Sequence, residues 1–104
     1  MRFSERVVKL ARSIPSGKVT TYGRLARAAG AGAMASRSIT AILGKAYEGG
    51  IKDIPFHRIV YANGKIWISE AYREKRLALY KKEGITVDAH DRIENFTDVL
   101  YEFL

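Results

Sequence analysis

The chain has 104 residues, of which 47% are hydrophobic and 28% are charged, and its formal net charge is +7 at pH 7. This length predicts one domain over residues 1–104, and the composition is typical of a folded protein rather than a disordered one. Cysteine is absent, which excludes disulfides, thiolate metal ligands and cysteine nucleophiles. The histidines lack the spacing of a metal site, and no apolar run approaches the about 20 residues of a membrane span. We therefore expect no metal, no cofactor, no membrane partner and an intracellular location.

The positive charge is concentrated in the first part of the sequence. Residues 1–87 contain 17 lysines and arginines against 6 aspartates and glutamates, whereas residues 88–104 contain 1 against 5. A basic body favours a polyanionic partner, most simply nucleic acid, because a protein that neutralises phosphates releases their counterions. Many basic proteins bind no nucleic acid, so the charge by itself leaves both possibilities open.

An apolar stripe at helical spacing begins the chain and consists of Val7, Val8, Ala11 and Ile14. Ser4, just before the stripe, is a capping-type residue, and Glu5 is an acid that suits the N-terminal end of a helix dipole. The pattern predicts a first helix that ends before Pro15, where a turn follows.

A second helix is predicted after this turn and a short extended segment. Thr21 can cap a helix that begins at Tyr22. Gly30 would end the helix, because glycine adopts the left-handed conformation of a helix C-terminus without strain. The helix would carry Arg24 and Arg27 on its outer side.

A third helix is predicted over about residues 34–46, starting near Met34. Its apolar face has the spacing i, i+3, i+4, i+7 and consists of Ile39, Ile42, Leu43 and Ala46. The opposite face repeats this spacing with one arginine and small residues, namely Arg37, Thr40, Ala41 and Gly44. Such a face can enter a nucleic-acid groove closely, and two helices joined by a glycine-containing turn indicate a helix-turn-helix. Packing of small residues against another helix explains the same face equally well.

A loop over residues 47–55 and then a hairpin or wing are predicted next. The apolar runs at residues 58–61 and 65–68 flank Ala62, Asn63 and Gly64. An Asn-Gly pair between two such runs is typical of a tight turn that joins two antiparallel strands.

Two further helices are predicted in the last third of the chain. Ser69 and Glu70 open a charged helix that ends before Gly84, with the inward candidates Leu77, Ala78 and Tyr80. A short amphipathic helix is predicted in the tail from the spacing of Phe96, Val99, Leu100, Phe103 and Leu104. The acids of the tail would face either the basic surface or solvent. The fold expected is a mainly helical α/β domain, winged-helix-like, with a helix-turn-helix and a short β-hairpin.

Several motifs, in the same order, resemble the DNA-binding domain of the O6-alkylguanine-DNA alkyltransferases. They are IPSGKVTTYGRLA, the helix with Arg37, IPFHRIV, ANG and KKEG, and the resemblance covers about residues 6–87. In that family the central motif is Pro-Cys-His-Arg, and its cysteine takes the alkyl group from a guanine flipped out of the duplex. Phe56 stands at the cysteine position here. This replacement, with the extended loop before it, is similar to the alkyltransferase-like proteins, which bind alkylated guanine without repairing it and usually have tryptophan at this position.

The resemblance implies roles for individual residues. Tyr22 would press on the phosphate of the flipped nucleotide, and Arg37 would enter through the minor groove and fill the gap in the base stack. His57 and Glu83 match a hydrogen-bonded pair that helps to activate the family's cysteine. With nothing to deprotonate here, His57 would hold the backbone that lines the pocket. Arg58 would either pair with an acid or position this loop.

Two sets of site residues follow from the resemblance. The residues implied for DNA binding and base flipping are Thr21, Tyr22, Arg37, Thr40, Ala41 and Gly44. The residues implied for the lesion pocket are Pro55, Phe56, His57, Arg58, Ile59, Trp67 and Ser69. Trp67 is equally well explained by ordinary packing of the wing. Some alkyltransferase-like proteins contact the lesion with an arginine near the position of Ser69, and the sequence indicates no equivalent.

The function implied is non-enzymatic binding of O6-alkylguanine in double-stranded DNA by base flipping, which would flag the lesion for nucleotide excision repair proteins. We expect a monomer. One alternative is a winged-helix transcriptional or architectural DNA-binding protein without lesion specificity, which would give no reason for the IPFHR motif. Another is a lesion hydrolase that uses His57 or an acid with water, which no paired carboxylates or metal spacing support.

Overall fold

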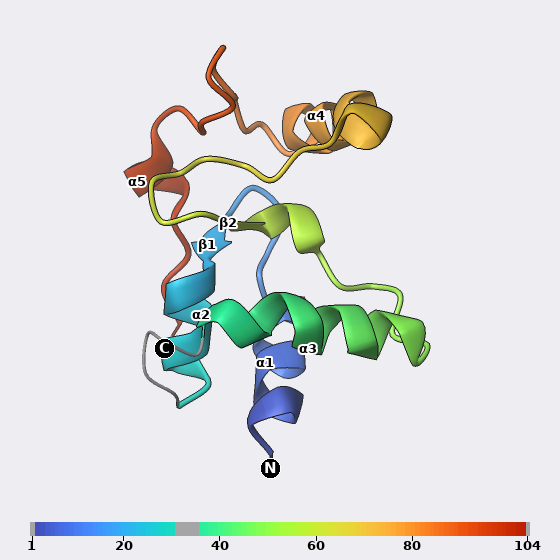
Figure 1. Ribbon diagram of the computed structural model, residues 1–104. Helices are drawn as coiled ribbons and strands as arrows, with labels where there is room; N and C mark the ends of the chain where they lie inside the picture. The colour runs from blue at the N-terminus through green and yellow to red at the C-terminus, as the bar shows by residue number, and fades with distance from the viewer. Residues whose placement is uncertain (1, 31–35, 104) are drawn as a thin grey trace.

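A computed structural model describes residues 2–30 and 36–103 of the chain. Three helices in its N-terminal half, α1 (Phe3–Arg12), α2 (Tyr22–Ala28) and α3 (Ser36–Glu48), pack against one another in the lower part of the molecule (Figure 1). The third helix was predicted to start near Met34, which lies outside the described residues. The helical content and the fold class therefore agree with the expectation from the sequence.

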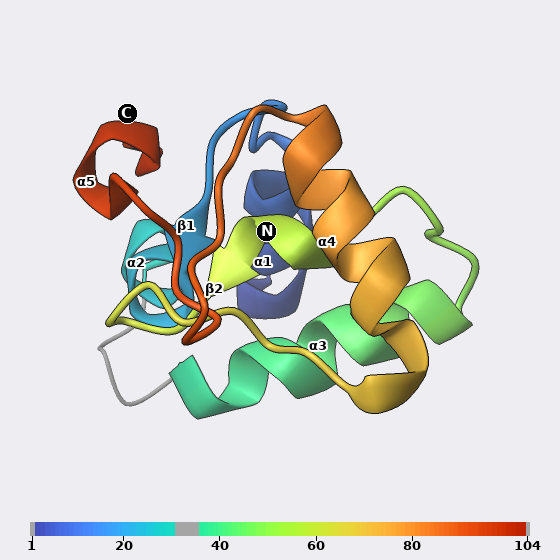
Figure 2. The ribbon, with the colours of Figure 1, turned by 90° about the horizontal axis from the view of Figure 1, so that it is seen from above.

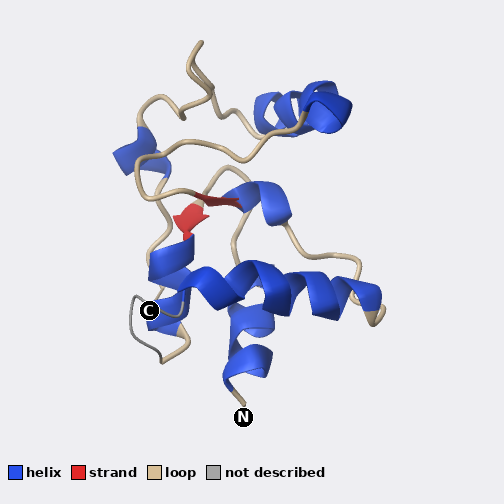
Figure 3. Cartoon of the chain, in the orientation of Figure 1, coloured by secondary structure: helices blue, strands red, loops and turns tan. Residues whose placement is uncertain are grey.

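The upper part of the molecule holds α4 (Arg73–Lys82), the short α5 (Phe96–Val99) and the long loops that connect them. A parallel sheet of two short strands, β1 (Thr20–Thr21) and β2 (Ile59–Val60), lies between the two parts (Figure 3). Viewed from above, α5 lies beside α2 and β1, on the side away from α4 (Figure 2).

Two hydrophobic clusters correspond to these two parts. The cluster among α1, α2 and α3 includes Val7, Ala11, Leu25, Ala26, Ile39 and Leu43. The cluster beneath α4 and the C-terminal segment consists of Val19, Val60, Ile66, Tyr80, Ile85 and Ile93. Since β2 contributes Ile59 to the first cluster and Val60 to the second, the sheet joins the helical base to the upper part. None of the helices in the described part of the chain has the length and apolarity needed to cross a membrane.

The ends of α1 differ from the prediction at one position. The helix begins at Phe3, two residues earlier than a cap at Ser4 would place it, with Arg2 as its N-cap and no side-chain cap. Phe3 packs against the first hydrophobic cluster, and this burial favours the earlier start. Ser4 therefore lies inside the first turn and does not cap it, whereas Glu5 occupies the first turn as predicted.

The capping of α2 is as predicted. The Oγ1 of Thr21 accepts a hydrogen bond from the N–H of Arg24 at 3.1 Å, which satisfies one of the free donors of the first turn. Gly30 follows the helix with a φ of +98°, and its N–H donates to the carbonyl of Arg27 at 3.0 Å. The helix therefore starts and ends where the sequence indicates, and its first residue is Tyr22.

The apolar face of α3 is the predicted one, since Ile39 and Leu43 are buried and Ile42 and Ala46 are half-buried. The helix continues to Glu48. Tyr47 therefore belongs to the helix, whereas the sequence had predicted it in the following loop.

The predicted hairpin is reduced to its turn. The N–H of Gly64 donates to the carbonyl of Tyr61 at 2.9 Å, and the N–H of Tyr61 donates to the carbonyl of Lys65 at 3.0 Å. The side chain of Asn63 accepts the N–H of Lys65 at 3.0 Å, which removes this donor from a ladder. In place of a second strand of a hairpin, Lys65 forms an isolated antiparallel bridge with Arg92.

The last two predicted helices are shorter than expected. A turn of 3-10 helix, η3 (Glu70–Tyr72), precedes α4, and Ala78 on α4 is exposed rather than inward. In the tail, α5 ends at Val99, and Leu100 then bridges Val19 in parallel. The N–H of Tyr101 donates to the carbonyl of Val19 at 2.7 Å. Pairing with the edge of β1 thus replaces the rest of the predicted helix, and Leu104 lies outside the described residues.

Candidate nucleic-acid interface

A cavity of about 750 Å³ opens between α2, α3, α4 and the turn that follows β2. We call it the aromatic cavity. Four rings line it, those of Tyr22, Phe56, Tyr61 and Trp67. Its basic side chains are Arg27, Arg37 and Arg76. No aspartate or glutamate is among the described residues that line it. Flat apolar walls with positive charge and no acid suit a planar, electron-rich group that is attached to a phosphate.

The sheet and the cap of α2 place Tyr22 at this cavity. Tyr22 is the first residue of α2 and directly follows β1, so its backbone is fixed by the Thr21 cap on one side and by the sheet on the other. Its ring lies 5.7 Å from that of Tyr61, measured between centroids. Burial, with the neighbouring Tyr61 as a smaller cause, raises the pKa of the Tyr22 phenol. The phenol therefore stays neutral at pH 7 and can donate a hydrogen bond.

The small face of α3 is open to solvent. Arg37, Thr40 and Ala41 are exposed. A Cβ placed on Gly44 would meet no heavy atom within 4 Å. Packing against another helix, the alternative left open by the sequence, therefore does not explain these small residues. The face is available for a partner, and Arg37 and Thr40 at its N-terminal end also line the aromatic cavity.

Phe56 opens a turn of 3-10 helix, η2 (Phe56–Arg58), which separates neighbouring side chains onto different sides. Phe56 is half-buried and lines the aromatic cavity, whereas Pro55 and His57 are buried behind it. The Phe56 ring also packs edge-on against Tyr47 of α3, with 5.9 Å between centroids. The residue at the cysteine position of the related motif is therefore part of the cavity wall.

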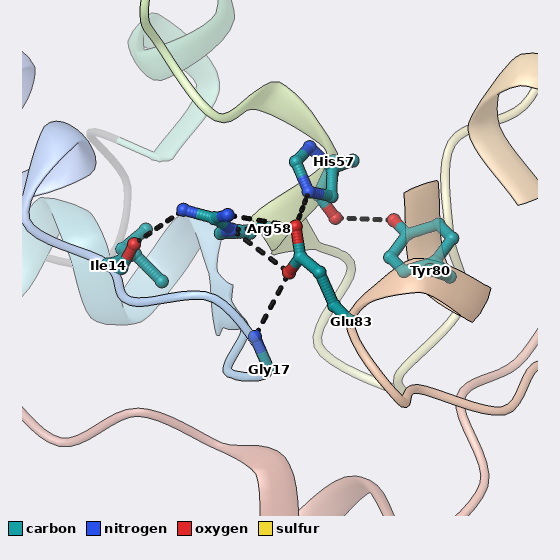
Figure 4. A network of polar contacts seen from close by, with 6 residues as sticks. All are labelled: Ile14, Gly17, His57, Arg58, Tyr80 and Glu83. Atoms are coloured by element: carbon teal, nitrogen blue, oxygen red, sulfur yellow. Dashed lines mark hydrogen bonds and ion pairs between the residues drawn. The ribbon is translucent and has the colours of Figure 1, made fainter. Parts of the chain in front are cut away.

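Behind this wall, the Glu83 carboxylate organises a polar network (Figure 4). It contacts His57 Nε2 at 2.5 Å and accepts a hydrogen bond from Arg58 Nη2 at 2.8 Å. It also accepts the backbone N–H of Gly17 at 3.1 Å. Arg58 donates in addition to the carbonyl of Ile14 at 2.9 Å. Arg58 thus does both things that the sequence left open, since it pairs with an acid and ties η2 to the turn after α1.

The ionisation of the network follows from these contacts. Burial on its own would raise the pKa of Glu83, but the hydrogen bonds from Arg58, His57 and Gly17 outweigh it and lower the pKa to about 2. Burial lowers the pKa of His57 despite the nearby carboxylate. His57 is therefore neutral at pH 7 and donates its Nε2 proton to Glu83. Tyr80 donates its hydroxyl to the carbonyl of His57, and burial raises the pKa of Tyr80 to about 12.

The structure brings together some of the sequence-predicted residues and separates others. Those that line the aromatic cavity are Tyr22, Arg37, Thr40, Phe56, Ile59 and Trp67. Thr21 is a buried helix cap, and Ala41 and Gly44 lie along α3 outside the cavity wall. Pro55, His57 and Arg58 support the wall from behind. Ser69 is half-buried, and its Oγ has no hydrogen-bond partner within the described part of the chain.

Six residues that line the cavity were not assigned to the site from the sequence, and two of them, Arg76 and Tyr61, contact its aromatic rings. Arg76 of α4 lies over the ring of Trp67, with 5.4 Å between its Cζ and the ring centroid. Arg76 precedes the buried Tyr80 by one helical turn, and this i, i+4 spacing was the available signal that it faces the body. Tyr61 follows β2 directly, but its place next to Tyr22 depends on a parallel pairing that no local pattern indicates.

Comparisons with known proteins agree with the motifs. The family model described as "6-O-methylguanine DNA methyltransferase, DNA binding domain" matches residues 2–85. A DNA base-flipping protein of Escherichia coli (strain K12) is 32% identical over 92 residues, which are 88% of this chain and 69% of that protein.

Solved structures show the same fold. Atl1 of S. pombe, in a crystal structure with damaged DNA containing O6-carboxymethylguanine, has a TM-score of 0.73 at 23% identity, and the match covers 98% of this chain and 99% of that chain. An O6-methylguanine methyltransferase of Mycobacterium tuberculosis has a TM-score of 0.59 at 28% identity, and the match covers 80% of this chain and 48% of that one.

The sequence contains no cysteine, and Phe56 stands in the motif that carries it in the transferases. The chain therefore offers no thiol that could accept an alkyl group. Since the family model extends over most of the chain and the similarity to a base-flipping protein covers 88% of it, the chain belongs to the family of the 6-O-methylguanine DNA methyltransferase DNA-binding domain, as an alkyltransferase-like member.

Proposed function

We propose that the protein binds O6-alkylguanine in double-stranded DNA, turns the altered base out of the helix into the aromatic cavity and leaves it chemically unchanged. The observation that carries this proposal is the position of Phe56, which lines the cavity within the motif that presents the acceptor cysteine in the transferases. The cavity volume of about 750 Å³ is within the roughly 300–1,000 Å³ of ordinary ligand sites. This volume is large enough for a nucleotide base with a small O6 substituent.

In this proposal Arg37 and Tyr22 hold the flipped state open. Arg37 is exposed at the N-terminal end of α3, and the small residues Ala41 and Gly44 farther along the same face would let the helix approach the floor of a groove. Its guanidinium would occupy the space that the guanine leaves and contact the unpaired base. Tyr22, at the edge of the same cavity, would press on the phosphate of the turned nucleotide and donate a hydrogen bond to it. Because a damaged pair costs less to open than an intact one, flipping itself contributes selectivity.

No step of the proposed function makes or breaks a covalent bond. His57 donates to Glu83 and this bond holds η2; with Phe56 at the acceptor position, the pair has no nucleophile to activate. The bound lesion would then be passed on, and we propose that nucleotide excision repair proteins receive it. On this proposal the protein acts as a monomer, inside the cell, on double-stranded DNA.

The test is a comparison of two duplexes of one sequence, with and without a single O6-methylguanine. Titration by fluorescence anisotropy at two salt concentrations is expected to show binding to the lesion duplex that is about tenfold tighter or more, since flipping a damaged base saves part of a few kcal/mol of unstacking. Equal affinities would instead support a DNA-binding protein without lesion specificity. Nucleotide excision repair proteins, added to both duplexes, should form a larger complex only where this protein holds a lesion.

A further inference from the structure

Tyr22 and Tyr61 are placed side by side by the register of the sheet. The parallel strands pair Thr20 with Ile59 and Thr21 with Val60. The residue that directly follows each strand is a tyrosine, since Tyr22 begins α2 after β1 and Tyr61 begins the turn after β2. The two rings leave the end of the sheet together, and both line the aromatic cavity. The sheet thus brings together two aromatic side chains from distant parts of the sequence.

The backbone of Tyr61 is fixed on both sides by the turn that follows it. Its N–H donates to the carbonyl of Lys65 at 3.0 Å, and its carbonyl accepts the N–H of Gly64 at 2.9 Å. Gly64 has a φ of +83°, and a Cβ there would lie 3.1 Å from the ring of Phe96, so the turn depends on glycine at this position. The ring of Tyr61 therefore projects from a rigid base.

The two rings meet in the geometry of an attractive aromatic pair. Their centroids are 5.7 Å apart and their planes are inclined by 42°, within the offset or tilted arrangements that aromatic pairs prefer. Tyr61 remains 43% exposed, so much of its ring is not used for packing in the core. The ring contacts Tyr22, and its exposed part lines the cavity.

A side chain that presses on a phosphate needs such support. Tyr22 is only half-buried, and a half-exposed side chain changes rotamer on the ps–ns timescale unless neighbours restrict it. A ring that yields when a nucleotide pushes against it cannot hold that nucleotide out of the stack. In the described residues, Tyr61 is the aromatic side chain in contact with the ring of Tyr22.

We propose that Tyr61 is a positioning residue that holds the ring of Tyr22 in the orientation in which it supports the flipped nucleotide. This inference rests on the proposed function and identifies a residue that determines how well that function is performed. Its effect is exerted through Tyr22 and not through a contact of its own with the lesion.

The first part of the test uses the free protein. In Tyr61→Ala, the ring proton shifts of Tyr22 in NMR spectra should move toward averaged values, whereas Tyr61→Phe should keep those of the parent. Tyr72→Ala is the matched control, because Tyr72 is 58% exposed and does not line the aromatic cavity. Thermal unfolding should be similar for all these variants, since each changes an exposed side chain. Unchanged Tyr22 shifts in Tyr61→Ala would overturn the proposal.

The second part is a double-mutant cycle on DNA with Tyr22→Ala, Tyr61→Ala and the combined variant. Tyr61→Ala is expected to lose about threefold to tenfold of the preference for the lesion duplex, the fold-change that corresponds to an aromatic pair, and Tyr61→Phe should retain it. The combined variant should bind like Tyr22→Ala alone, because support for an absent ring has no effect. The fluorescence of a 2-aminopurine placed beside the lesion should report less flipping in the same variants.

Additive losses in the cycle would overturn the positioning role and indicate an independent contact of Tyr61 with DNA. Failure of the proposed function looks different, since the parent protein itself would then show no preference for the lesion duplex. A parent that prefers the lesion, with a Tyr61→Ala variant that keeps the full preference, leaves the proposed function standing and removes the role of Tyr61.

Discussion

Phe56 lies in a motif whose polar residues are fully engaged with one another. Glu83 binds His57, Arg58 and the backbone of Gly17, and Tyr80 donates to the carbonyl of His57. These contacts hold His57 and Glu83 behind the wall of the aromatic cavity, and no histidine, aspartate or glutamate is among the described residues that line the cavity. The same contacts hold the short η2 turn in place, so the residue at position 56 forms a wall with a fixed shape.

Replacement of Arg37 by alanine should separate the two ways in which an arginine can bind DNA. If Arg37 fills the gap left by the flipped base, Arg37→Ala will cost about 1–3 kcal/mol for the lesion duplex and distinctly less for undamaged duplex. Lys45→Ala, also exposed on α3, is the control for a general charge effect. Titrations of both duplexes at two salt concentrations measure the difference, and equal losses from Arg37→Ala on the two duplexes would make it a phosphate contact only.

At the residue scale, short sequence patterns predicted the ends of α2, which depend on neighbouring residues only. The Thr21 cap and the terminal Gly30 were identified because helix ends use specific short-range hydrogen bonds. Arg76 and Tyr61 were missed because each reaches the cavity through contacts between segments far apart in the sequence. The partner of Arg58 was left open for the same reason, and it became clear only when Glu83 was placed next to it.

At the scale of elements, α3 combines two faces with different requirements. Ile39 and Leu43 anchor it in the core, and the opposite face is open. This helix was well predicted because amphipathic spacing is a strong signal over thirteen residues, Ser36–Glu48. The hairpin and the tail helix were predicted less well. Lys65 pairs with Arg92, and Leu100 pairs with Val19, and both bridges depend on the tertiary fold.

Gly44→Ala should separate the stability of α3 from its function. Alanine is the better helix former, and the new methyl group would meet no heavy atom within 4 Å. The free energy of unfolding should therefore increase by about 0.5–1 kcal/mol. If the small face approaches DNA closely, the same methyl group should weaken binding to both duplexes. Urea unfolding and anisotropy titrations check the two effects, and a variant that is more stable and binds equally well would contradict close approach at Gly44.

The Glu83 network should make stability depend on pH. The folded-state pKa of Glu83 is lowered to about 2, against about 4.3 in an unfolded chain. The unfolded state therefore binds the proton first as the pH falls, so the contribution of Glu83 is complete above about pH 5 and is lost toward pH 2.

Glu83→Gln should consequently unfold more easily at pH 7, by about 2–4 kcal/mol, because it leaves Arg58 without its acid. The difference from the parent should shrink as the pH falls from 5 toward 2. Urea unfolding at several pH values measures this, with Glu74→Gln, a change at an exposed acid of α4, as the control. A difference that stays constant down to pH 2 would show that the carboxylate charge is not what stabilises the network.

At the scale of the whole molecule, the acidic C-terminal segment lies on the basic body. Arg24 of α2 pairs with Glu102 at 3.0 Å, and Arg73 of α4 pairs with Asp91 at 3.0 Å. Of the two orientations that the sequence left open for the tail's acids, these two residues take the one toward the basic surface. The segment thus satisfies part of the excess positive charge, and the arginines of the aromatic cavity remain outside these pairs.

No cysteine occurs anywhere in the chain. We therefore expect no transfer of a methyl group from guanine to the protein. Duplex DNA with a labelled methyl group on guanine, incubated with the protein, should retain the methyl group, and the mass of the intact protein should stay unchanged. A transferase of the same fold serves as the positive control. A methyl adduct on the protein, or release of the methyl group or base, would show that the complex does carry out chemistry.

The parallel pairing of β1 with β2 also has a consequence for the order of folding. The three helices of the base can assemble through contacts between neighbouring segments, whereas Thr21 meets Val60 only after a long loop has closed. Contacts between distant residues form late, because the entropy of loop closure is lost before they stabilise the chain. On the proposed function, a chain that emerges during synthesis would thus acquire its basic helical surface, and with it a general attraction for phosphates, before its two tyrosines meet to support a flipped base.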